Sequence, residues 1–214
     1  MQGVCQFVHA CEGARSSVID SERNESDLLT EIRRVRAERE AELRIRFDRS
    51  LPFADGLFDR WERARQLGFG EEASIYDSAF VFGHVRVGAR SWIGPNTILD
   101  GSGGGLTIGA TCSVSAGVHI YTHDTVLWAL SGGTCEKRLA PVIVGDCCYI
   151  GPQAVITAGV TIGSHCIIGA NSLVAENVPD RTFVAGSPAR VKGRIVGEGR
   201  EVRIEKTSDE GGRA

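Results

Sequence analysis

Residues 144–174 read VGDCCYIGPQAVITAGVTIGSHCIIGANSLV, and an aliphatic side chain returns in them at every sixth position. Fourteen residues share this spacing: Ile75, Val81, Val87, Ile93, Leu99, Ile108, Val114, Ile120, Val144, Ile150, Ile156, Ile162, Ile168 and Val174. A small or aliphatic residue stands two positions before most of them, and glycine directly follows seven of them. No ordinary helix or strand has a period of six. The repeat therefore predicts a parallel β-helix, in which each unit is one short strand and one turn and the aliphatic column fills the interior.

The repeat is interrupted twice. Three extra residues lie within the glycine-rich run 99–105, and eighteen extra residues are extruded around 124–141. With Ile75 as turn zero, these breaks fall in turns four and seven. Because three units complete one triangular coil, both breaks are expected at the same corner in adjacent coils, ~4.8 Å apart along the axis. We predict that the two insertions form the walls of one pocket.

Composition limits the possible functions of the chain. Its 214 residues carry a net charge of −3, so it has no basic footprint for nucleic acid. No apolar run approaches the ~20 residues that a membrane span requires, and no leader pattern begins the chain, so we expect a cytoplasmic protein. Cys112, Cys148 and Cys166 fall at inward positions, where cysteine acts as a small hydrophobe. Cys5, His9 and Cys11 form an incomplete ligand set, and we predict no metal site.

Four regions are expected along the chain. Residues 1–26 lack periodicity and predict a disordered tail. Residues 27–70 predict a helical cap region, with one helix from Ser26 or Asp27 to Phe47 and a second from about Gly56 to Leu67, ended by Gly68. The second helix is expected to cover the open first coil. Residues 71–195 predict the β-helix, with the extruded loop 124–141, and residues 196–214 predict a disordered tail.

Three segments resemble the left-handed β-helix family of hexapeptide acyltransferases. They are VGARSWIGPNTI (87–98), the run 144–174 quoted above, and AGSPARV (185–191). The spacing alone does not give the hand of the coil, since parallel crossovers are right-handed in ~98% of cases. The resemblance implies a left-handed coil, acetyl-CoA as the acyl donor, and a homotrimer with the site between subunits.

His123 is the candidate general base. It stands at the start of the larger insertion, in Tyr121-Thr122-His123-Asp124, and an imidazole titrates near neutral pH. The resemblance implies this role, because the family carries its catalytic histidine just before such a loop. Asp124 is expected to orient the ring or contact the acceptor.

Four residues near His123 are predicted to bind the acceptor. Asp100 lies one coil below Tyr121 at the equivalent position, and the resemblance implies an acidic residue near there that binds acceptor hydroxyls. The alternative for Asp100 is support of the glycine-rich turn. The other three are Asp124, Tyr121 and Trp128. Trp128 could stack on a sugar ring or anchor the loop, and Trp92 is a further candidate for stacking.

The resemblance also implies a groove between coils for coenzyme A. Small residues in the late coils and two cations in GSPARVK match it: Gly151, Ala158, Gly159, Ala170, Arg190 and Lys192. Each glycine could equally serve its own turn. Relatives often have Thr-Lys where this chain has Ala175-Glu176, so one phosphate contact is expected to be missing or replaced.

We therefore predict transfer of an acetyl group from acetyl-CoA to a hydroxyl or amino group of a sugar or nucleotide sugar. Direct attack by the acceptor requires no covalent enzyme intermediate. One alternative is a zinc carbonic anhydrase of the γ class, which shares the fold and would use His84, His119 and His123 across a subunit boundary. Another is a non-catalytic scaffold, for which uninterrupted repeats would be expected.

Overall fold

The computed structural model describes residues 21–207, with side chains from Asp27 onward. It divides into two compact units, Met1–Leu57 and Phe58–Ala214, which are described separately. Cys5, His9 and Cys11, considered above as metal ligands, lie outside the described residues.

The first unit contains α1 (Ser21–Phe47) and α2 (Phe53–Leu57). The expected end of α1 at Phe47 is correct, but the helix begins at Ser21, so the predicted tail of residues 1–26 is wrong from Ser21 onward. Pairs of Arg and Glu one turn apart, such as Arg34 and Glu38 at 2.6 Å, support this exposed helix.

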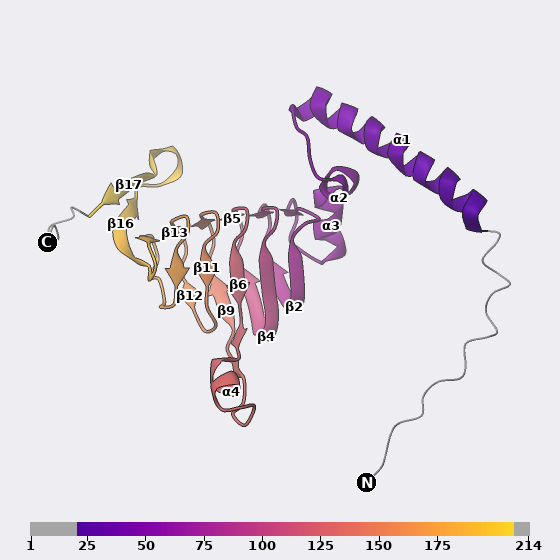
Figure 1. The fold of residues 1–214 in the computed structure, drawn as a ribbon. Coiled ribbons are helices and arrows are strands. Elements are labelled where there is room, and N and C mark those ends of the chain that lie inside the picture. Colours follow the sequence, from indigo (N-terminus) through magenta and orange to yellow (C-terminus); the bar gives the residue numbers. More distant parts are fainter. Residues whose placement is uncertain (1–20, 208–214) are drawn as a thin grey trace, which may run out of the picture. The chain divides into compact units, whose positions relative to one another are not determined.

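The second unit begins with α3 (Arg60–Gln66), which lies against the first coil of the β-helix (Figure 1). A single helix over 56–67 is wrong, because Asp59 caps a new helix by accepting hydrogen bonds from the amides of Trp61 and Glu62. Arg63 of α3 donates hydrogen bonds to the carbonyls of Tyr76 and Ala79 in the first coil. The region 27–70 is therefore not one cap, since it is divided between the two units at Leu57.

Short parallel strands stack into two sheets. The first sheet has eight strands in the order β1 (Ser74–Ile75), β3 (Trp92–Ile93), β5 (Ser113–Val114), β10 (Tyr149–Ile150), β13 (Ile167–Ile168), β15 (Thr182–Ala185), β16 (Arg190–Val196) and β17 (Arg203–Lys206). The second has the order β12 (Thr161–Ile162), β9 (Val142–Val144), β4 (Ile98–Ile108), β6 (His119–Tyr121), β11 (Val155–Ile156) and β14 (Leu173–Val174), and β2 (Phe80–Val87) pairs with β4.

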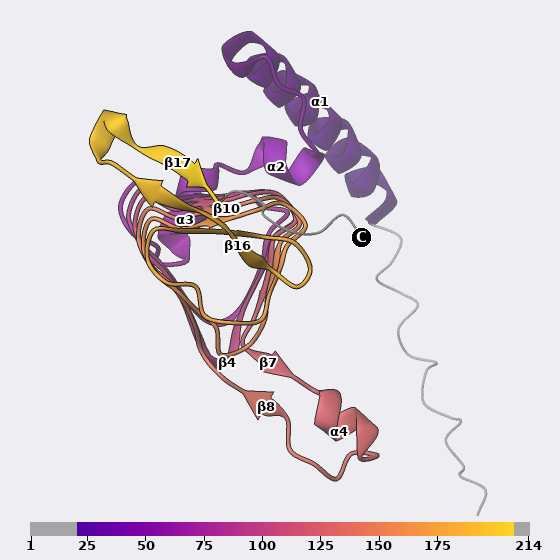
Figure 2. The ribbon, with the colours of Figure 1, turned by 90° about the vertical axis from the view of Figure 1, so that its left-hand side faces the viewer.

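These sheets form the three faces of a triangular coil, which Figure 2 shows end-on. Face 1 consists of β1, β3, β5, β10, β13 and β15. Face 2 consists of the first halves of β2 and β4 with β6, β11 and β14, and face 3 of their second halves with β9 and β12. The six-residue spacing therefore predicted the three-sided parallel β-helix correctly.

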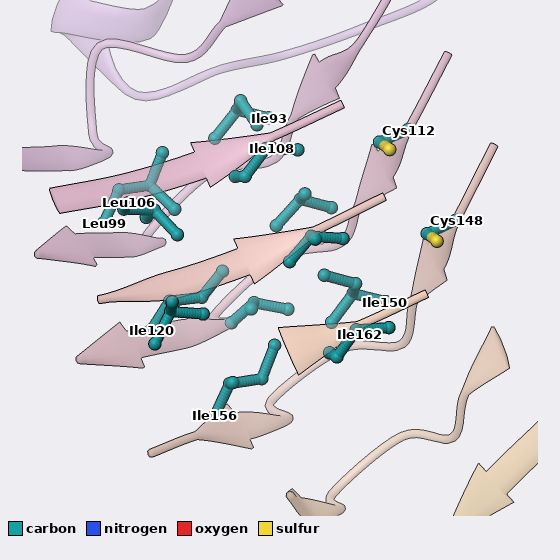
Figure 3. Close-up of a cluster of buried hydrophobic side chains, with 14 of the residues drawn as sticks. Ile93, Leu99, Leu106, Ile108, Cys112, Ile120, Cys148, Ile150, Ile156 and Ile162 are labelled. Atoms are coloured by element: carbon teal, nitrogen blue, oxygen red, sulfur yellow. The ribbon is translucent and has the colours of Figure 1, made fainter. Parts of the chain in front are cut away.

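The aliphatic column fills the interior (Figure 3). Ile93, Leu99, Ile120 and Ile150 are fully buried, and of the fourteen column residues only Val81 is partly buried rather than buried. Glycine follows the column because the turn then approaches the next coil: a Cβ on Gly145 would lie 2.7 Å from the Ser164 amide nitrogen. The turn position thus has no room for a side chain, whereas the column position just before it needs a large one to fill the interior.

Three buried cysteines occupy inward positions in neighbouring coils. Cys148 donates a hydrogen bond through its thiol to the Gly163 carbonyl, 3.0 Å away. Hydrogen bonds to the thiols of Cys112 and Cys166, together with burial, raise the pKa of Cys148. This thiol therefore stays neutral and packs as a hydrophobic side chain.

A hairpin follows the last coil. β15 pairs antiparallel with β16 and β16 with β17, and a short 3₁₀ helix (Gly199–Glu201) joins the last two strands. The predicted disordered tail of 196–214 is therefore wrong as far as Thr207, because Ile195 and Ile204 face each other across this added sheet. The remaining residues, 208–214, lie outside the described part.

The segment 123–141, which includes the predicted loop 124–141, contains β7 (His123–Asp124), α4 (Val126–Leu130) and β8 (Arg138–Leu139), and β7 and β8 form a two-stranded antiparallel sheet. Figures 1 and 2 show it projecting from the side of the β-helix. Among residues 21–207, no helix combines the length and the apolar character that crossing a membrane requires.

Candidate functional site

Both interruptions of the repeat lie at the corner between faces 2 and 3. We call this the insertion corner, formed by residues 82–84, 100–106, 121–141, 157–160 and 175–177. β4 continues through it from Asp100, which pairs with Tyr121, to Leu106, which pairs with Val142. The two insertions are thus neighbours in adjacent coils.

Thr122 holds the two insertions together. This side chain is fully buried, donates a hydrogen bond to the Asp100 carbonyl and accepts one from the Gly103 amide, both at 2.8 Å. Its own carbonyl accepts a hydrogen bond from the Ala140 amide at 2.9 Å, where the larger loop returns. A Cβ on Gly103 would collide with that carbonyl, so glycine is required there. Thr122 was not among the predicted residues. Its signal in the sequence was a threonine between the column residue Ile120 and His123.

His123 contacts the carboxylate of Asp100. The Nδ1 atom of His123 lies 3.0 Å from Oδ2 of Asp100, whose side chain is only 7% exposed, while the histidine is 33% exposed. Since a carboxylate accepts hydrogen bonds, this contact favours the tautomer with the proton on Nδ1. The Nε2 atom then keeps a lone pair that can accept a proton.

Ser102 fixes the other oxygen of Asp100. Its amide donates to Oδ1 at 2.9 Å and its hydroxyl donates to the same atom at 2.6 Å, while the hydroxyl is 3.4 Å from Nδ1 of His123. Asp100 therefore contacts His123 and accepts the hydrogen bonds of the glycine-rich turn, while the contact with acceptor hydroxyls that the resemblance implied stays a prediction. Ser102 was not among the predicted residues, and its signal was a hydroxyl within an insertion otherwise made of glycine.

Asp124 does not orient His123. One of its oxygens accepts a hydrogen bond from the Val126 amide at 3.2 Å, and the other lies 3.6 Å from a guanidinium nitrogen of Arg138. Arg138 also donates to the Ala158 carbonyl at 3.2 Å. The expected orienting role of Asp124 is therefore wrong, because neighbouring side chains on β7 point to different sides. Asp124 and Arg138 tether the loop to the next coil.

The aromatic candidates lie in three different places. Tyr121 is half-buried on the strand beside Asp100, and its hydroxyl is 3.4 Å from Nδ1 of His119. Trp128 on α4 is 45% exposed and packs near Gly133 in the loop. Trp92 lies on face 1, edge-on to Tyr76 at 6.3 Å, and so is not part of this corner.

The histidines of the zinc alternative do not gather in one chain. His84 is exposed on β2, while His119 contacts Tyr121 and His123 contacts Asp100. Across the part of the chain that the structure describes, no three His, Cys, Asp or Glu residues are grouped so that they could hold a metal ion.

The residues predicted for coenzyme A fall into separate places. Ala158 and Gly159 lie at the insertion corner beside the loop, and a Cβ on Gly159 would lie 3.3 Å from both Ala140 and Arg138. Gly151 and Ala170 are neighbours at the corner between faces 1 and 2, where a Cβ on Gly151 would lie 2.6 Å from the Ala170 amide nitrogen. Gly159 is exposed and has a positive φ of 84°, which favours glycine, whereas Ala158 is buried and its carbonyl accepts a hydrogen bond from Arg138 of the loop.

Arg190 and Lys192 lie on β16, and a cavity of about 110 Å³ lies at the last coil. Arg190 and Glu176 both line this cavity and lie 3.7 Å apart. Glu176 belongs to the pair Ala175-Glu176, which departs from the family pattern. The remaining lining is mostly apolar: Leu173, Val174, Ala175, Asn177, Val178, Pro179, Val184, Pro188, Ala189 and Val191.

Two family models match the repeat. Residues 84–122 match the hexapeptide repeat of succinyl-transferase, and residues 141–176 match the bacterial transferase hexapeptide of six repeats. Curated relatives include a serine acetyltransferase of Staphylococcus epidermidis, 36% identical over 125 residues (58% of this chain and 53% of the relative). Another is the galactoside O-acetyltransferase of Escherichia coli, 32% identical over 94 residues (40% and 46%). The chain thus spans about half the length of the curated relatives it matches.

Solved structures match more of the chain. A hexapeptide-repeat acetyltransferase from Vibrio cholerae is 30% identical with a TM-score of 0.57, over 75% of this chain and 90% of that one. The same protein complexed with acetyl coenzyme A is matched at 29% identity, with a TM-score of 0.57, over 77% of this chain and 88% of that one. An N-acyltransferase from Bacillus cereus, at 23% identity and a TM-score of 0.54 over 62% and 88%, shares the fold.

Proposed function

Because the chain belongs to the hexapeptide-repeat acetyltransferase family, we propose that it transfers an acetyl group from acetyl-CoA to an acceptor, with His123 as general base. The β-helix of this family is left-handed, so the expected hand of the coil is correct. One observation carries the proposed role of His123, namely its contact with the buried Asp100 at the insertion corner.

The geometry of the Asp100–His123 pair suits proton transfer. With Nδ1 directed to Asp100, Nε2 of His123 can take the proton of an acceptor hydroxyl or amine as that group attacks the thioester carbonyl carbon. The bond from carbon to sulfur then breaks, and the imidazolium returns its proton to the departing sulfur. The Asp100 carboxylate stabilises the positive ring between the two transfers. General-base assistance of this kind is worth ~10²–10⁴-fold in rate.

We propose that the late coils bind the acetyl-CoA donor. The cavity of about 110 Å³ and the cation of Arg190 at its edge suit an apolar group joined to phosphates. Gly151, Gly159, Ala170 and Lys192 remain candidates for the same ligand, whereas Ala158 is a weaker one because it is buried and its carbonyl is bonded to Arg138. The Glu176 carboxylate near Arg190 would weaken a phosphate contact there.

The proposed acceptor is a small molecule with a free hydroxyl, and the first candidate is a sugar or nucleotide sugar. Similarity to the galactoside O-acetyltransferase supports a sugar, and similarity to serine acetyltransferases supports a hydroxyl amino acid as the second candidate. The proposed contacts to the acceptor are Tyr121, which lies beside Asp100, and Trp128, which lies on the loop. An amino group on the sugar remains part of the proposal, since the same base can serve either nucleophile.

We also propose a homotrimer. Face 2 carries an outward row of mainly apolar side chains: Phe80, Ile98, His119, Val155 and Leu173. Face 1 carries a second row of Tyr149, Ile167 and Phe183, whereas face 3 presents Arg86, Thr107, Ile143 and Thr161. Face 2 of one copy against face 1 of the next is a head-to-tail contact that can close into a ring. A neighbouring copy on face 2 would also wall the site beside His123.

The test is release of free thiol from acetyl-CoA with a panel of sugars, nucleotide sugars and L-serine. We expect His123→Ala to lower kcat by ~10²–10⁴-fold with an active acceptor. His165→Asn is the matched control, because His165 lies at a different corner and asparagine tolerates its positive φ of 59°. Equal turnover by wild type and His123→Ala would contradict the proposed base.

A further inference from the structure

β17 is the last strand of the first sheet, and its outer edge has no strand partner among residues 21–207. All four of its residues, Arg203 to Lys206, are exposed. Figure 1 shows β16 and β17 at the end of the β-helix opposite to α3. The first coil is covered by a helix, whereas the strand edge at the other end is open to a further strand.

The hydrogen bonds within the hairpin show which backbone groups face this open edge. Lys192 and Thr207 are joined by a bond from the Thr207 amide to the Lys192 carbonyl, at 2.9 Å. In an antiparallel pair, bonded and non-bonded residues alternate, so Glu205 and Arg203 bond to β16 and Ile204 does not. The amide and carbonyl of Ile204 therefore point away from β16, toward the open edge.

The side chains around Ile204 are complementary to a second copy of themselves. In an antiparallel pair centred on Ile204, the two Ile204 residues exchange two backbone hydrogen bonds, and each Arg203 stands opposite Glu205 of the other copy. In this chain Arg203 and Glu205 already form an ion pair at 3.1 Å on one side of the strand. Protective edge strands usually carry charges that repel their own copy, but this order of charges attracts it.

We propose that β17 pairs with β17 of a second copy of this chain, in a two-fold antiparallel contact centred on Ile204. The contact is isologous, because the same surface serves both partners. One four-residue strand pair is small for a stable interface, but the trimer proposed above would present three such strands at one end. Two trimers would then join end to end. The stability of this contact therefore rests on the proposed trimer, whereas it does not depend on the proposed acetyl transfer.

Sedimentation of the full chain tests the backbone part of the proposal. We expect the wild type to have twice the mass of Ile204→Pro, which removes the edge-facing amide without touching a bond to β16. Ile204→Thr keeps that amide and is expected to retain the larger mass. Circular dichroism of each variant checks that the β-helix is intact. Equal masses for wild type and Ile204→Pro would overturn the proposal, whether or not the protein is a trimer.

Charge reversal tests the register. Arg203→Glu and Glu205→Arg, each alone, place like charges opposite each other and are expected to halve the mass. The double variant Arg203→Glu/Glu205→Arg restores both attractive pairs, and an equimolar mixture of the two single variants does the same between unlike copies. We therefore expect the larger mass in both cases. A mixture that stays at the smaller mass would show that the register centred on Ile204 is wrong.

Discussion

At the scale of single residues, the site depends on a carboxylate twenty-three positions before the histidine that it orients. Asp100 is 7% exposed and accepts hydrogen bonds from the Ser102 amide and hydroxyl, so its position beside His123 is fixed from two sides. Asp124, the neighbour of His123 in sequence, instead secures the loop through Val126 and Arg138. Closeness along the chain is therefore a poor guide to which acid serves the base.

A pair of matched substitutions separates these two acids. We expect Asp100→Asn to lower kcat by about 10²-fold, because an amide can donate to Nδ1 and so favour the tautomer whose Nε2 is already protonated. Asp124→Asn should leave kcat within a few-fold, since it loses only contacts within the loop. Steady-state kinetics of both variants with the best acceptor is the measurement. Equal losses would assign the two carboxylates the same role.

At the scale of elements, most strands of the coil have only two residues, and the second of them carries the inward side chain. The strand β12 shows this division, with Ile162 1% exposed inside the coil and Thr161 exposed outside it. The stability of each unit therefore depends on the inward residue and on contact with the coils on either side.

Substitution on β12 measures this division. Ile162→Ala is expected to lower the free energy of unfolding by about 2–5 kcal/mol, because it leaves a cavity between coils. Thr161→Ala, one residue away on the exposed side, should change it by less than about 0.5 kcal/mol. Urea denaturation at one fixed protein concentration compares the two. A similar cost at both positions would contradict the division into inward and outward residues.

At the scale of the whole molecule, the outward rows of faces 1 and 2 leave apolar side chains on two sides of the β-helix unit. Their registers run through consecutive coils, so each row is continuous along the axis. Continuous apolar surface of this kind is typical of contacts between subunits. Face 3 carries mainly polar side chains in the same positions.

An arginine on face 2 tests the trimer. Val155→Arg places a charge in the centre of the proposed contact, and we expect the assembly to dissociate toward the single-chain mass of 22.9 kDa. Thr107→Arg, on exposed face 3, should leave the assembly intact. Light scattering of both variants in the Ile204→Pro background separates this contact from the one proposed for β17. A trimer that survives Val155→Arg would rule out face 2 as its interface.

Several features could be predicted from the residues alone. The six-residue spacing of column residues such as Ile150 and Ile156 gave the three-sided coil, and counting units in threes brought Asp100 and Tyr121 into adjacent coils. The break between α2 and α3 was missed because the apolar spacing continues across it, while Asp59 caps the second helix. The final hairpin was missed because its few apolar residues, such as Ile195 and Ile204, gain partners only once β15 is in place.

The sequence by itself determined the architecture and the corner that holds His123, because a strict period leaves one way to bury the aliphatic column. Only the tertiary structure decided that Asp100 contacts this histidine, that Asp124 turns to Arg138, and that Arg138 of the loop bonds to the Ala158 carbonyl. The physical reason is that the residues of an insertion do not follow the six-residue repeat. Side-chain directions there depend on hydrogen bonds between coils, such as those of Thr122, which no local spacing records.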